Sequence, residues 1–137
     1  MTALGRLSLL VDGRRPPGVY RAPPSPLLPA TIAAALRARG TTVWVLDTRD
    51  VRDKAGFLDR CARDLALPSW FGRNWDALVD VLRERGPGVV LWCGASALAD
   101  DVTSTAIDVF TERTQSAPSF TVVLVNADAV RATVPVL

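Results

Sequence analysis

The chain contains no histidine, only two cysteines, a single lysine and a single methionine. Without histidine it lacks the side chain that most often serves as a general base or a metal ligand. Cys61 and Cys93 are too far apart in the sequence for a short zinc motif and have no histidine to join them, so we expect two free, buried thiols. A glycine-rich phosphate loop is also missing. We therefore predict a protein that is not an enzyme and that holds no metal and no cofactor.

Long hydrophobic runs are missing as well. The apolar stretch near the N-terminus is too short for a signal peptide or a membrane span, and no basic segment precedes it. We therefore expect a cytoplasmic protein without membrane contact. A hydrophobic share of 49% and a charged share of 22% over 137 residues are ordinary for one globular domain with a real core.

Charge is distributed unevenly along the chain. Residues 41–126 hold 12 acidic and 9 basic side chains, whereas residues 1–40 hold 6 arginines and only one acid, Asp12. The basic N-terminal region leaves RNA binding open as an alternative. Its arginines are scattered among prolines without interleaved aromatics, which is not typical of an RNA-binding motif.

Residues 65–82 form the most informative stretch. Asn74 is a good N-cap, so a helix is predicted to begin at Trp75. Trp75, Leu78 and Leu82, with Val81 alongside, recur at helical spacing and are expected to face the core.

Asp76 and Asp80 lie on another face of this helix. At i and i+4 they are neighbours without an intervening cation, which is slightly unfavourable in an isolated helix and suggests an external partner. Asp76 could instead serve only the positive end of the helix dipole, and Asp80 could be a plain solvated acid. A catalytic carboxylate pair is disfavoured, because exposed acids lack the burial that tunes a catalytic pKa.

The preceding loop, residues 68–72, carries two adjacent aromatics. It is too short to bury both rings, so we expect Phe71 to point inward and Trp70 outward, although Trp70 could also belong to the core. Gly72 is expected to supply a positive φ or a close backbone approach.

The remaining pattern alternates strands and helices. Continuous apolar strands are predicted at residues 43–47, 89–93 and 120–125, and such runs suit parallel strands covered on both faces. Helices are predicted at about 54–65, capped near Asp53, and at 96–115, with a break near Asp100 and Asp101. The sequence therefore predicts an α/β fold with a small, mostly parallel three-stranded sheet and helices packed on it.

Residues 1–40 are predicted to form an N-terminal extension to a domain of residues 41–126, and residues 127–137 to form a C-terminal tail. Residues 7–11 suggest a short strand, and residues 19–21 could return beside it. Six of the chain's ten prolines fall between Pro16 and Pro29, which suggests a surface linker. Residues 31–39 predict a helix that ends at Gly40.

The run Leu-Ala-Leu-Pro-Ser-Trp-Phe-Gly-Arg-Asn-Trp-Asp-Ala-Leu-Val-Asp-Val-Leu, residues 65–82, resembles the signature of the barstar family. These proteins are intracellular inhibitors of small secreted ribonucleases of the barnase type. The similarity is long and ungapped here and extends more weakly from about Thr42 to Asn126. The resemblance implies the same α/β fold independently.

The resemblance also implies roles for individual residues. Asp80 matches the acid at the centre of the family's interface, and Asp76 matches a second acid one turn earlier. Trp70 stands where the family has an aromatic that packs over the enzyme's catalytic histidine. Glu112 matches an acid on the later helix that pairs with a rim arginine, although it could be an ordinary surface acid.

Two further matches and two departures concern the loop and the helix. Gly72 and Asn74 match residues that shape the loop and can contact the enzyme. Arg73 stands where a familiar barstar has an acid, and Val79 stands where it has a tryptophan. The tryptophan-bearing segment that should follow the signature helix is shortened to residues 83–88.

These observations predict an inhibitor that forms a one-to-one complex with a small cationic ribonuclease. A ribonuclease active site binds phosphates in a positive cleft, which helix-borne carboxylates can occupy instead. The alternative is an immunity protein or binding module of the same fold that is directed at a different toxin or a non-nuclease partner. Neither function requires direct nucleic-acid binding.

Overall fold

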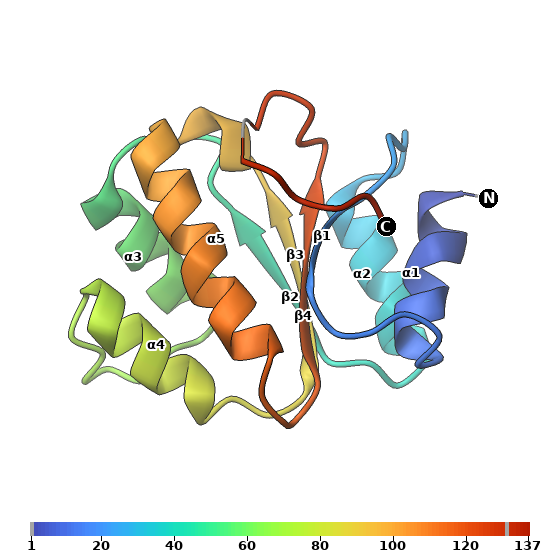
Figure 1. Ribbon diagram of the computed structural model, residues 1–137, viewed down its shortest axis with the longest axis horizontal. Helices are drawn as coiled ribbons and strands as arrows, with labels where there is room; N and C mark the ends of the chain where they lie inside the picture. The colour runs from blue at the N-terminus through green and yellow to red at the C-terminus, as the bar shows by residue number, and fades with distance from the viewer. Residues whose placement is uncertain (1, 131) are drawn as a thin grey trace.

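The computed structural model describes residues 2–130 and 132–137 and has helices on both faces of a central sheet (Figure 1). In chain order the elements are α1 (Ala3–Val11), β1 (Val19–Arg21), α2 (Pro29–Ala38), β2 (Val43–Asp47), α3 (Lys54–Asp64), α4 (Trp75–Arg83), β3 (Gly88–Cys93), the 3₁₀ helix η1 (Ala95–Ala97), α5 (Asp100–Thr114) and β4 (Phe120–Val125).

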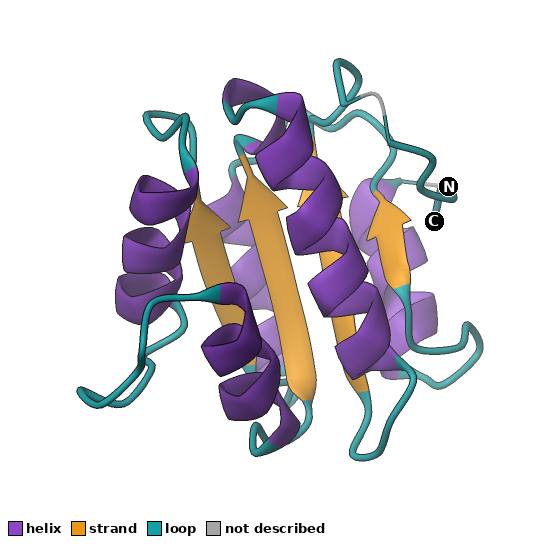
Figure 2. Ribbon diagram, turned by 60° about the vertical axis from the view of Figure 1, so that its left-hand side comes forward, coloured by secondary structure: helices purple, strands orange, loops and turns teal. Residues whose placement is uncertain are grey.

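The sheet has the strand order β1-β4-β3-β2, and every neighbouring pair is parallel (Figure 2). The predicted α/β class is therefore confirmed. The prediction of three strands is wrong by one, because residues 19–21 form a fourth strand beside β4. The strand suggested at residues 19–21 is therefore present, but its partner is β4 and not residues 7–11. This pairing is a long-range contact that the local sequence does not reveal.

Side chains of the strands alternate between two cores. In β3, Val90 and Trp92 face α3, α4 and α5, while Val89 and Leu91 face α1 and α2. Because both faces are covered, all six residues of β4 are buried. This burial explains the continuous apolar character of the strands, as expected for a parallel sheet.

The prediction of a strand at residues 7–11 is wrong, because these residues belong to α1. The Thr2 hydroxyl accepts a hydrogen bond from the Gly5 amide and caps this helix. Ala3 and Leu7, four residues apart, are buried on its inner side. A short apolar run fits either a strand or a helix, and here it packs as a helix against α2.

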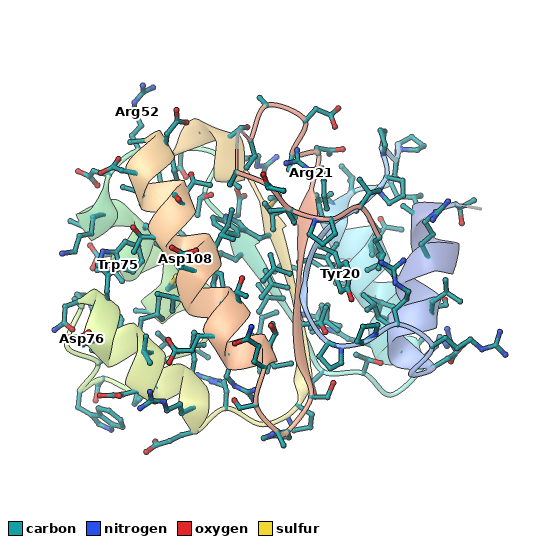
Figure 3. All side chains as sticks on the ribbon, viewed as in Figure 1. Tyr20, Arg21, Arg52, Trp75, Asp76 and Asp108 are labelled. Atoms are coloured by element: carbon teal, nitrogen blue, oxygen red, sulfur yellow. The ribbon has the colours of Figure 1, made fainter. Side chains whose placement is uncertain are left out.

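The C-terminal segment closes the outer edge of β1. The Arg21 amide donates to the Pro135 carbonyl at 2.8 Å, and the Leu137 amide donates to the Arg21 carbonyl at 2.9 Å. The Arg21 guanidinium lies beside this segment (Figure 3) and donates to the carbonyls of Ala127, Val130 and Ala132. Strand β1 and the C-terminal segment are thus held together at one edge of the sheet.

Candidate functional site

The loop of residues 68–74 and α4 present the predicted site residues at the outside of the molecule. Asn74 caps α4 as predicted, with its side-chain oxygen accepting from the Ala77 amide at 2.8 Å. Its side-chain amide donates to the Gly72 carbonyl at 3.2 Å. A single residue therefore fixes both the start of the helix and the end of the loop, which removes conformational freedom from this surface.

Helix α4 places its acids and its apolar side chains on opposite faces. Leu78, Val81 and Leu82 are buried, as predicted. Trp75 is only partly buried; its ring packs against Phe57, with 5.6 Å between ring centroids. Because this inner face is anchored, the orientation of the outer face is fixed.

Asp76 and Asp80 both lie on the exposed face of α4. The carboxylate of Asp76, labelled at the outer end of the helix in Figure 3, makes no ion pair and no hydrogen bond with any residue that the structure describes. The Asp80 side chain is 74% exposed and forms an ion pair with Arg83 at 3.4 Å. Neither acid is locked into the interior, so both can accept hydrogen bonds from another molecule.

The two aromatic rings of the loop separate as predicted. Phe71 is buried in the core, whereas Trp70 is 69% exposed, the most exposed large hydrophobic side chain of the described chain. An exposed indole beside charged groups is common at protein interfaces, where it contributes large contact area with few rotatable bonds.

The prediction of a positive φ at Gly72 is wrong. The positive φ falls on the next residue, Arg73, at 48°. An added Cβ at Gly72 would lie 3.4 Å from the side chains of Ala77 and Asn74, which is ordinary contact rather than a forced close approach. The Arg73 guanidinium donates to Asp59 of α3 at 2.6 Å, so a cation, and not a flexible glycine, ties this turn to the rest of the fold.

Glu112 reaches the same surface from α5. Arg83, at the end of α4, lies between two acids: its guanidinium is 3.4 Å from Asp80 and 3.4 Å from Glu112. The structure thus brings Asp80 and Glu112 to one arginine although they are far apart in the sequence.

Val79 is partly buried against the core between the acids of α4. Together with residues of α5 it lines a hollow of about 130 Å³; the lining residues are Val79, Arg83, Val109, Glu112, Arg113 and Ser116. This hollow adjoins the acidic face directly, because Arg83 and Glu112 belong to both.

Sequence reasoning missed the importance of Arg113. Arg113 as a whole is 3% exposed, and this burial lowers the pKa of its guanidinium. It donates to four carbonyls, those of Leu82, Arg85, Ser116 and Pro118, at 2.7 to 3.0 Å. In the sequence, this role could have been suspected only from the position of Arg113 on the otherwise apolar face of a predicted helix. Its contacts anchor the end of α4 to α5 and to the turn before β4.

The basic N-terminal region is mostly engaged in internal contacts. Arg6, Arg21 and Arg37 donate to backbone carbonyls, Arg39 pairs with Asp12, and Arg15 donates to a carbonyl and stacks on Tyr20. Of the six arginines, Arg14 alone makes no such contact within residues 2–130 and 132–137. These contacts are no support for the alternative of RNA binding.

Residues 2–130 and 132–137 contain no cluster of three or more side chains able to hold a metal ion, and no helix long and apolar enough to cross a membrane. Cys61 and Cys93 are free and buried, as predicted. Burial raises the pKa of both thiols, that of Cys93 to about 11, so neither is a ready nucleophile.

A comparison with known proteins finds a family match that covers the region from β2 to β4. The family model Barstar, described as barnase inhibitor, matches residues 41–125, and no curated protein matches the chain. The matched segment contains the loop of residues 68–74, α4 and α5, and it spans more than half of the 137 residues. The chain therefore belongs to the barstar family.

Proposed function

We propose that the protein is an intracellular inhibitor of a small secreted ribonuclease of the barnase type and that it covers the active site of that enzyme in a one-to-one complex. The observation that carries the proposal is the exposed pair Asp76 and Asp80, one helical turn apart on the anchored helix α4. The exposed ring of Trp70 lies on the loop that leads into this helix.

The chemistry of RNA cleavage explains why acids suit this task. A ribonuclease must hold phosphates, so its active site gathers arginine and lysine side chains. Carboxylates accept paired hydrogen bonds from guanidinium groups in much the same way as phosphate oxygens do. Asp80 would occupy the phosphate site, and Asp76 would pair with a second cation one turn away.

The remaining predicted contacts surround this centre. Trp70 would stack on a ring or a cation in the enzyme, and Glu112 would pair with an arginine at the rim. Gly72 and Asn74 would contribute backbone contacts, while Arg73 and Val79 would lie within the covered area and tune the fit.

Rigidity supports the proposal. The Asn74 cap fixes one end of α4, and the Arg113 contacts fix the other. A binding surface that is already in place loses little conformational entropy when the complex forms, so more of the interaction energy remains as affinity.

Inhibition can be tested by titrating barnase, as a first probe within a panel of small secreted ribonucleases, with the purified protein and following RNA cleavage. The decisive variant is Asp80→Ala. Removing one partner of a charge pair that is buried in a complex costs about 3–5 kcal/mol, so we expect inhibition to weaken by about two to three and a half orders of magnitude.

Asp12→Ala is the matched control, because Asp12 is also an exposed, ion-paired acid but lies on α1's side of the sheet. Both variants should keep nearly the wild-type melting temperature. Unchanged inhibition by Asp80→Ala would remove Asp80 from the mechanism. Raising the salt concentration should weaken the wild-type complex mainly by slowing association.

A second candidate is an immunity protein or binding module for a different toxin or a non-nuclease partner. Arg73 favours it, because this cation stands at the edge of the acidic surface and is held there by Asp59. The short turn of residues 84–87 between α4 and β3 also favours this candidate, because it replaces the longer, tryptophan-bearing segment that the family resemblance implies. Absence of a complex with every ribonuclease of the panel would favour this candidate over the first.

A further inference from the structure

Arg83 occupies a position that the proposed inhibitory contact does not explain. Its guanidinium lies 3.4 Å from both the Asp80 and the Glu112 carboxylates, and so joins α4 to α5 across the acidic face. The three side chains are 63%, 74% and 57% exposed, respectively. A cation therefore already lies where the proposed partner would have to place its own.

This arrangement is looser than other ion pairs of the protein. Arg73 lies 2.6 Å from Asp59, and Arg49 lies 2.7 Å from Asp47, as expected for charge-assisted hydrogen bonds. At 3.4 Å the Arg83 contacts exceed the usual range of 2.7–3.2 Å. Exposed pairs of this kind contribute little to stability, so Arg83 can be displaced at small cost.

We propose that Arg83 is a built-in counter-ion that holds Asp80 and Glu112 in the free protein and is displaced by a cation of the ribonuclease when the complex forms. This inference rests on the proposed function. Arg83 is thus a specificity-determining residue: it keeps the two carboxylates close together and admits only a partner whose cations compete with it successfully.

Two effects follow for binding. In the free protein Arg83 offsets the repulsion between two neighbouring carboxylates, so its removal raises the free energy of the unbound state but not that of the bound state. Its positive charge also reduces the negative field that attracts a cationic enzyme. Removing the charge should therefore tighten the complex, the reverse of what is expected for a residue that itself contacts the partner favourably.

The test compares Arg83→Gln, Arg83→Lys and Arg39→Gln by measuring association and dissociation rates with barnase and with the rest of the ribonuclease panel. Arg39→Gln is the matched control, because it removes the same charge from an exposed ion pair on the α1 and α2 side of the sheet. We expect Arg83→Gln to bind about fivefold more tightly than the wild type, mainly through faster association. Arg83→Lys and Arg39→Gln should stay within about twofold of the wild type.

The outcomes separate this inference from the function on which it rests. Tighter binding of Arg83→Gln, or binding by this variant where the wild type shows none, supports the counter-ion role. If the wild type binds and Arg83→Gln binds equally or more weakly, the role is refuted while the inhibitory function stands. If neither protein binds any ribonuclease of the panel, the proposed function fails and the inference fails with it.

Discussion

Arg113 offers the sharpest test of how the fold supports the acidic surface. We consider Arg113→Met, which keeps most of the side-chain volume and removes the guanidinium. The substitution deletes hydrogen bonds to the carbonyls of Leu82, Arg85, Ser116 and Pro118. It also deletes the contact of the guanidinium with the Phe120 ring, at 4.7 Å from its centroid.

The magnitude follows from these contacts. Hydrogen bonds to a charged group contribute about 1.5–3 kcal/mol each, but the cost of burying the Arg113 charge offsets a good part of their sum. Arg113 is 3% exposed, so its charge is largely removed from water, and this burial lowers the pKa of the guanidinium. We therefore expect a loss of about 3–5 kcal/mol in the free energy of unfolding, because each buried carbonyl left without a donor costs about 1–3 kcal/mol and some of the four regain water.

The assay is urea unfolding followed by circular dichroism, with Arg63→Met as the matched control. Arg63 also makes an ion pair, to Asp64 at 2.8 Å, but its side chain is 64% exposed. The control should lose at most about 1 kcal/mol. A loss below about 1 kcal/mol for Arg113→Met would refute the anchoring role, because it would mean that the freed carbonyls find water at no cost.

Two smaller predictions concern a loop and a cap. Hydrogen bonding to Arg49 lowers the pKa of Asp47 to about 2, so the pair stabilises the fold above the unfolded-state value near 4 and loses this contribution as the pH falls toward 2. Because Arg49 is exposed, we expect an effect of only about 1 kcal/mol, visible as a smaller acid-induced fall of the urea midpoint in Asp47→Asn than in the wild type. Asn74→Ala should lower the free energy of unfolding by about 0.5–2 kcal/mol, while Asn74→Asp should retain most of it; equal losses in the two variants would argue against capping by the side-chain oxygen.

The stretch of residues 65–82 could be predicted closely because its signals are local. A cap at Asn74 and apolar residues at helical spacing define α4 within the sequence itself, and the same spacing places Asp76 and Asp80 on the other face. The outward ring of Trp70 followed from the shortness of the loop. These features depend on residues within a few positions of one another.

The N-terminal region could not be predicted in the same way. Residues 7–11 fit a strand or a helix equally well. They form a helix because the second apolar face of the sheet is buried by packing helices against it. The strand suggested at residues 19–21 does form, but it pairs with the edge of β4 instead of residues 7–11. Helix α1 packs on α2, and residues 19–21 pair with β4, about a hundred residues further along the chain; neither contact is visible in the local sequence pattern.

The sequence by itself determined the alternation of strands and helices from residue 43 onward, the position of α4 and the exposure of its acids, because capping and periodicity act between near neighbours. Only the tertiary structure decided that Arg113 anchors the end of α4 and that Arg83 lies between Asp80 and Glu112. The physical reason is that an arginine side chain finds its acceptors in space, and only the packing of α4 against α5 brings those acceptors within reach.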